Sequence, residues 1–75
     1  MVSYTKRLRD LREDLDIKQE NIAKALKTTQ SQYSKYELGK RPLPIEHIIT
    51  LCKLYNVSAD YILGFTNEKK PLPKK

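Results

Sequence analysis

The chain has 75 residues, of which 39% are apolar and 32% are charged, and it carries a net charge of +6. A chain of this length forms one small domain and buries only about 60% of its unfolded surface, which argues against a deep enclosed active site. The single cysteine, Cys52, excludes an internal disulfide and a cysteine-rich metal site. No apolar run has membrane length, and the first ten residues lack the apolar stretch of a signal peptide. We therefore expect a cytoplasmic binding protein with no transmembrane helix.

The positive charge is concentrated in one part of the sequence. Residues 1–17 are neutral, whereas residues 18–41 hold six basic and two acidic side chains. Residues 42–65 carry a net charge of −1, and the last ten residues carry +3. A polyanion is the natural partner of a basic region, although scattered lysines on a solvated helix surface would give a similar count.

Helical spacing dominates the chain, and no stretch alternates strictly enough to indicate a strand. The first helix has an apolar arc of Tyr4, Leu8, Leu11 and Leu15, and Asp16 suits a left-handed C-cap. A second, short helix is predicted over 19–26. Its apolar residues are Ile22, Ala23, Ala25 and Leu26.

A third helix is predicted over 30–38 after a tight turn at 27–29. Thr29 is a suitable N-cap because its hydroxyl can accept a backbone N–H two or three residues later. Gly39 suits the C-cap, and Pro42 and Pro44 prevent the helix from continuing.

The fourth helix is predicted from about residue 44 to residue 55, with Asn56 as its left-handed cap. Its expected inner arc contains Ile45, Ile48, Ile49, Leu51, Cys52 and Tyr55. A final short helix follows Ser58 and ends at Gly64. We therefore expect an all-α, compact five-helix bundle over residues 1–65. Residues 66–75, with four lysines, two prolines and one large apolar residue, are expected to form a flexible basic tail.

The second and third helices with their short turn form a candidate helix-turn-helix unit. On the third helix, Tyr33, Tyr36 and Glu37 share one side, at about 240° to 340° from Gln30. The opposite side is polar, contains no acid, and offers groups that can pair with base edges or phosphates. Its residues are Gln30, Ser31, Ser34 and Lys35.

Two charged residues are expected inside the bundle. Arg12 lies beside the leucines of the first helix, and Glu37 lies on the inner side of the third. A buried charge is costly unless it is paired, so we predict an Arg12–Glu37 salt bridge that fixes the third helix against the first. Two partly exposed charges are the alternative.

From Leu8 to Gly64, more than three quarters of its length, the chain resembles the Cro and lambda-repressor-like helix-turn-helix family, also called the XRE family. The matching segments are Leu11-Arg12, Gln19-Glu20, Ile22-Ala23, Ser34-Lys35-Tyr36-Glu37, Gly39-Lys40-Arg41-Pro42 and Val57-Ser58 with Asp60. The chain departs from the family at Lys27, where glycine is usual, at Lys18, where Ser or Thr caps the second helix, and at Leu38, which points outward.

This resemblance implies a five-helix bundle that binds operator DNA as a homodimer. By position, Gln30, Ser31, Ser34 and Lys35 would face base edges or the flanking backbone. Gln19 would contact a phosphate while bracing Gln30, and Gln32 would reach a phosphate or a thymine methyl group. Gly39, Lys40 and Arg41 would lie along the DNA backbone after the third helix.

We therefore predict a sequence-specific transcriptional regulator, most simply a repressor of a two-fold operator, with the helix over 30–38 in the major groove. Surplus apolar residues over about 54–65 predict the homodimer contact. The alternative is a protein-interaction module such as an antitoxin-like partner. The sequence has no nucleophile–base pair, phosphate-binding glycine loop or metal cluster, so we expect no enzyme, metal or cofactor. His47 and Cys52 lie about 140° apart on their helix, so we expect a surface histidine and a core cysteine.

Overall fold

The computed structural model describes residues 3–69. Within this range it contains five α-helices and no strand: α1 (Tyr4–Asp14), α2 (Gln19–Ala25), α3 (Gln30–Glu37), α4 (Ile45–Tyr55) and α5 (Ala59–Leu63). The predicted all-α five-helix fold is confirmed. Each predicted helix is present with bounds that differ by a residue or two, as is usual where helix ends fray.

Short polar residues and left-handed residues define the helix ends. The Thr29 hydroxyl accepts the backbone N–H of Gln32 at 3.2 Å, and the Ser58 hydroxyl accepts that of Tyr61 at 3.1 Å. Lys18 makes no side-chain cap at the start of α2. Between residues 3 and 69, five residues adopt positive φ at the ends of the five helices: Asp16, Lys27, Gly39, Asn56 and Gly64. Lys27 therefore adopts a conformation that costs a non-glycine residue roughly 1 kcal/mol.

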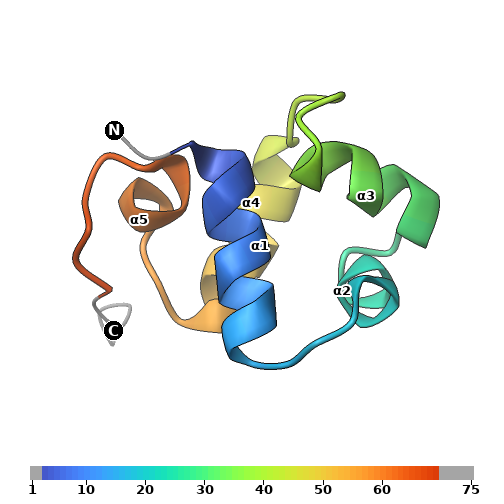
Figure 1. Cartoon of the computed structure of the whole chain (residues 1–75), viewed down its shortest axis with the longest axis horizontal. Coiled ribbons are helices and arrows are strands. Elements are labelled where there is room, and N and C mark those ends of the chain that lie inside the picture. The colour runs from blue at the N-terminus through green and yellow to red at the C-terminus, as the bar shows by residue number, and fades with distance from the viewer. Residues whose placement is uncertain (1–2, 70–75) are drawn as a thin grey trace.

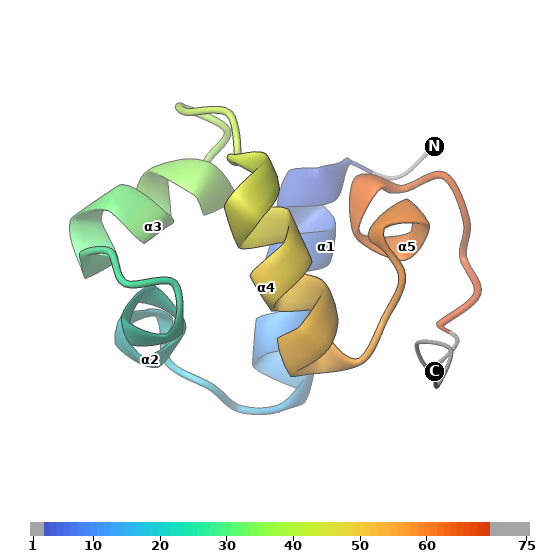
Figure 2. The ribbon, with the colours of Figure 1, turned by 180° about the vertical axis from the view of Figure 1, so that it is seen from behind.

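The helices are arranged along the long axis of the molecule in three groups (Figure 1). The α2 and α3 helices lie at one end, α1 and α4 cross the middle, and α5 lies at the other end. The reverse view shows α4 in front of α1 (Figure 2). All five helices or their flanking loops contribute to one core, which consists of Leu8, Leu11, Ile22, Ala23, Leu26, Tyr33, Tyr36, Leu51, Cys52, Tyr55, Val57 and Ile62.

Some apolar residues that were expected to face the core are exposed instead. Leu15 is 58% exposed because α1 ends at Asp14 and Leu15 is its cap. Ile45 and Ile49 are 65% and 51% exposed. The apolar residues of α4 cover more than half of its circumference, and only the side of α4 that carries Leu51 and Tyr55 reaches the core. The prediction that Leu15, Ile45 and Ile49 are internal was wrong.

The segment after α5 returns along the bundle. Its first contact is with Arg7 of α1, whose guanidinium donates to the carbonyl oxygen of Thr66 at 3.3 Å and to the side-chain oxygen of Asn67. Lys69 then lies 3.6 Å from Asp14. The contacts of the bundle thus continue past residue 65, where the domain was expected to end. Residues 70–75 of the expected basic tail lie outside the described residues.

Candidate nucleic-acid interface

The inner side of α3 is held by two tyrosines. Tyr33 is completely buried and Tyr36 is 6% exposed. Their rings pack edge to face with centroids 6.3 Å apart. Tyr36 makes a second edge-to-face contact with His47 of α4, at 5.7 Å. His47 is therefore half-buried against an aromatic ring and is not the simple surface residue that the sequence predicted. These ring contacts leave α3 little freedom to turn about its axis.

The four predicted base-reading residues lie on the other side of α3. Gln30 and Ser31 are exposed, and Ser34 and Lys35 are half-buried. None of the four has a side-chain hydrogen bond or an ion pair with another residue between 3 and 69. Their polar groups are therefore available to a ligand. The helical repeat places them over an arc of about 140°, which is wide enough to face a groove of DNA.

The predicted Arg12–Glu37 salt bridge is present and joins α1 to α3. The Nε of Arg12 donates to one carboxylate oxygen of Glu37 at 2.7 Å, and the terminal nitrogen Nη2 of Arg12 donates to the other oxygen at 3.1 Å. The remaining terminal nitrogen donates to the carbonyl oxygen of Ile17 at 2.9 Å. The side chain of Glu37 is only 2% exposed, so this bidentate pair is well shielded from water.

Gln19 at the start of α2 completes this network. Its amide nitrogen donates to Glu37 at 3.1 Å. The family resemblance implies that Gln19 braces Gln30, and in the structure the hydrogen bond of Gln19 goes to Glu37. One of the two amide hydrogens is used by Glu37, which leaves the second hydrogen and the side-chain oxygen of Gln19 for another partner. The network thus connects α1, the start of α2 and the end of α3.

The charge state of Glu37 follows from two opposing effects. Burial alone raises the pKa of Glu37, but the hydrogen bonds from Arg12 and Gln19 outweigh it and bring the pKa below its usual value. The Tyr33 hydroxyl also favours the ionised carboxylate, although its geometry falls short of a hydrogen bond. The hydrogen bond to Glu37 raises the pKa of Arg12. Both groups are therefore charged at neutral pH.

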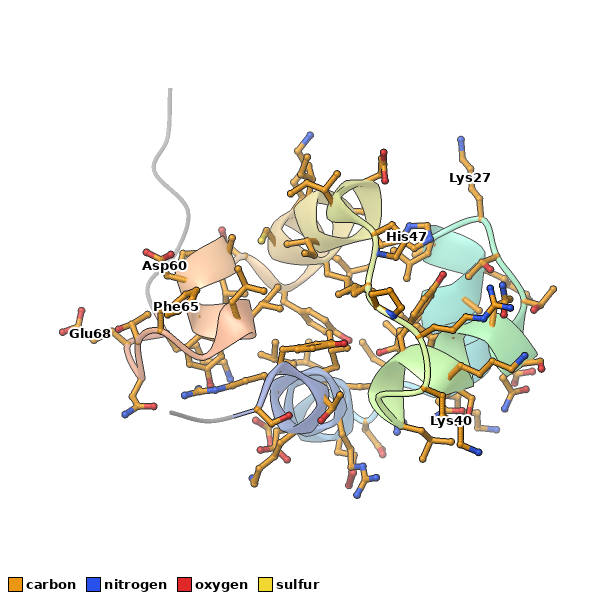
Figure 3. All side chains as sticks on the ribbon, turned by 90° about the horizontal axis from the view of Figure 1, so that it is seen from above. Lys27, Lys40, His47, Asp60, Phe65 and Glu68 are labelled. Atoms are coloured by element: carbon orange, nitrogen blue, oxygen red, sulfur yellow. The ribbon has the colours of Figure 1, made fainter. Side chains whose placement is uncertain are left out.

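The predicted backbone-contacting residues lie around α3. Gly39 follows the helix with a φ of 74°, and Lys40 and Arg41 are exposed in the loop after it. Gln32 is half-buried near the start of α3. Figure 3 shows Lys27 and Lys40 on opposite sides of the α2–α3 pair. The acidic residues labelled there, Asp60 and Glu68, lie at the α5 end.

Three further observations bear on other kinds of site. Among residues 3–69, no three His, Cys, Asp or Glu side chains are grouped so that they could hold a metal ion. No helix in the same range is long and apolar enough to cross a membrane. Cys52 is a free, buried thiol whose pKa is raised by burial, as expected of a core residue.

Comparison with known proteins gives a consistent result. The family model described as helix-turn-helix matches residues 8–62. An uncharacterized HTH-type transcriptional regulator of Bacillus subtilis (strain 168), YobD, is 37% identical over 91% of this chain and 61% of its own length. A second such regulator, YqaE, is 34% identical over 88% of this chain and 58% of its own. The HTH-type transcriptional regulator ImmR from the same organism is 35% identical over 84% and 50%.

The chain thus spans between half and about three fifths of the length of these relatives. The comparison with solved structures found no significant match.

Proposed function

The chain belongs to the XRE-type helix-turn-helix family, and from this premise we propose that it is a sequence-specific DNA-binding transcriptional regulator. One observation carries the proposal. The tyrosine side of α3 is locked into the core, while Gln30, Ser31, Ser34 and Lys35 have no partner within the described chain. A rigid helix with an unoccupied, acid-free polar side is what a major groove accommodates.

The residue types on α3 determine what it would read. The Gln30 amide can pair with both hydrogen-bonding groups of adenine, and Lys35 can reach guanine or a phosphate. Ser31 and Ser34 can donate to or accept from either kind of base. These four residues would supply discrimination between sequences, because contacts to base edges carry sequence information.

A second group of residues would position the protein on the DNA backbone. Lys40 and Arg41 supply charge in the loop after α3, and the left-handed Gly39 brings its backbone close to the duplex. Gln19 and Gln32 supply amide donors near the starts of α2 and α3. The second amide hydrogen of Gln19 would bind a phosphate while the first stays on Glu37. Contacts of this kind supply affinity without reading sequence.

We propose a cytoplasmic repressor that occludes a promoter by binding a two-fold operator as a homodimer. The dimer contact predicted from the sequence covers residues 54–65, where Leu54 is 39% and Phe65 is 69% exposed. Recovery of bound duplexes from a random DNA pool tests the proposal. A two-fold consensus is the expected result, and a pool that remains random after selection would contradict it.

The alternative reading, a protein-interaction module such as an antitoxin-like partner, requires no affinity for DNA. Electrophoretic mobility on random DNA at low salt separates the two readings. A DNA-binding domain retards random DNA through its phosphate contacts even without an operator. Absence of any retardation would favour the interaction module.

A matched pair of lysine variants tests the placement of the interface. Lys40→Ala removes a charge from the loop after α3, and Lys69→Ala removes the same charge at the α5 end. We expect Lys40→Ala to weaken binding to all sequences and to lower the slope of log K against log salt by about one. Lys69→Ala should leave the affinity for DNA and this slope nearly unchanged. Equal effects would mean that only net charge matters, and the proposed orientation would be wrong.

A further inference from the structure

The outer side of α4 exposes two isoleucines one turn apart. Ile45 is 65% and Ile49 is 51% exposed, whereas Leu51 and Tyr55 of the same helix are buried. The α4 helix lies at the border of the bundle, and no other element passes over its outer side in the reverse view or from above (Figures 2 and 3). Exposed apolar side chains that are adjacent on a rigid helix indicate an association surface.

Two opposite charges lie on α4 on either side of Ile49. Glu46 and Lys53 are both exposed, and neither forms an ion pair with a residue between 3 and 69. They are seven residues apart, so they project from nearly the same side of the helix as Ile49. The midpoint between them falls between Ile49 and Thr50. Ile49 is therefore almost at the centre of a pattern that runs from an acid at one end to a base at the other.

This α4 surface, with an acid at one end and a base at the other, is complementary in charge to a second copy that lies antiparallel to it. In a two-fold contact, residue i meets residue j of the partner and residue j meets residue i. An antiparallel pair of α4 helices centred between Ile49 and Thr50 brings Glu46 opposite Lys53 of the partner subunit, and the same pair forms a second time. The Ile49 side chains of the two copies then lie close together between the two ion pairs, and each Ile45 lies just beyond Glu46 at the edge of the contact.

We propose that the outer side of α4, formed by Ile45, Glu46, Ile49 and Lys53, binds a second copy of this chain in this antiparallel, two-fold arrangement. The inference rests on the proposed function, which requires a dimer, and it specifies the contact surface. This surface differs from the contact over residues 54–65 that the sequence predicts, where Leu54 and Phe65 are also exposed.

The position of α4 also suits a two-fold operator. The α3 and α5 helices lie at opposite ends of the long axis, which extends 32 Å, and α4 lies between them (Figure 1). A partner that binds α4 lies alongside the molecule, so its α3 comes closer than it would in a partner attached beyond α5. Recognition helices in successive major grooves on one side of DNA must be only about 34 Å apart.

Charge-exchange variants test this surface in the absence of DNA, by sedimentation equilibrium of the whole chain. The wild-type chain is expected to form dimers. Glu46→Lys places two lysines opposite each other at both ion pairs, and Lys53→Glu places two glutamates there. Each single variant is expected to weaken dimerisation by at least about tenfold, because like charges across an interface repel. The double variant Glu46→Lys/Lys53→Glu restores both pairs in reversed orientation and is expected to recover the wild-type dimerisation constant.

The double variant is the matched control for folding and for net charge. All three changes are on the surface, and far-ultraviolet circular dichroism checks that the helices are retained. A wild-type chain that stays monomeric at several hundred micromolar would overturn the proposal. Single variants that dimerise like the wild type, or a double variant no better than the singles, would also overturn it.

Different results would contradict the proposed dimer surface and the proposed DNA-binding function. If the Glu46→Lys variant is monomeric and still retards random DNA, the proposed DNA interface on α3 does not depend on the dimer. A wild-type chain that forms the α4 dimer but does not bind random DNA would contradict the proposed function and leave the dimer surface standing.

Discussion

Two arginines on α1 are held in different ways, Arg7 buried and Arg12 with 15% of its side chain exposed. Arg12 lies against a carboxylate, Glu37, at the α2–α3 end of the molecule. Arg7 is buried at the α5 end, with its guanidinium 4.1 Å from the centre of the Tyr61 ring and hydrogen bonds to Thr66 and Asn67. No carboxylate is among these partners, and the Nε of Arg7 has no hydrogen-bond partner.

The difference shows how each end of the molecule is stabilised. At the α3 end, a shielded ion pair with defined geometry fixes the orientation of the helix that is proposed to read DNA. At the α5 end, an aromatic ring, a carbonyl oxygen and an amide hold the chain after the last helix, and none of these requires an opposite charge. The first arrangement depends on the ionisation of one acid, and the second does not.

The largest expected effect comes from breaking the ion pair. Glu37→Ala leaves the guanidinium of Arg12 buried without its counter-charge, and we expect a loss of about 3 kcal/mol or more in the free energy of unfolding. That is a large part of the stability of a domain of this size. Glu13→Ala is the matched control, because Glu13 is exposed and lies 4.0 Å from Arg9. It is expected to cost under about 0.5 kcal/mol. Similar losses in the two variants, measured by urea unfolding, would contradict the account.

The pH dependence of the same pair sharpens this result. The pKa of Glu37 in the folded state lies below its usual value of 4.5, so the stabilisation from its ionised form is present above that pH. It is lost as the pH falls through the lowered pKa. The stability difference between the wild type and Glu37→Gln should therefore narrow below about pH 4.5. A difference that stays constant from pH 7 to pH 3 would show that the pair does not act through its charge.

Arg7→Met is expected to have a smaller effect. The substitution removes the ring contact and the hydrogen bonds to the segment after α5 but retains much of the buried stem, and we expect a loss of about 1–3 kcal/mol. The loss should be nearly the same at pH 4 and pH 7, because no carboxylate takes part. Arg7→Lys keeps the charge without the planar group and should recover only part of the stability. Full stability in Arg7→Met would mean that Arg7 does not hold this segment.

The same contrast explains what could be predicted from the sequence. Arg12 and Glu37 were predicted to pair because each lies on the inner side of a helix. A charge in that position is costly unless an opposite charge pairs with it. The partners of Arg7 are an uncharged ring and amide groups more than 50 residues away, and no periodic pattern indicates them. The caps at Thr29, Ser58 and Asn56 were predictable because they depend on local chemistry.

The errors on α4 have a related cause. The spacing of its apolar residues indicated a helix, but six apolar residues over a wide arc do not say which of them face the core. Only the packed structure shows that Ile45 and Ile49 are outside. Likewise, Gln19 was placed at the start of α2 from the sequence, but its hydrogen bond to Glu37 depends on how α2 and α3 meet in space.

The proposed function requires that the polar side of α3 discriminates between DNA sequences. Gln30→Ala tests it most directly, with dissociation constants measured on the selected operator and on random duplex at one salt concentration. We expect a loss of about 1–3 kcal/mol in binding free energy on the operator and almost none on random DNA. Equal losses on both, or no loss on the operator, would contradict it.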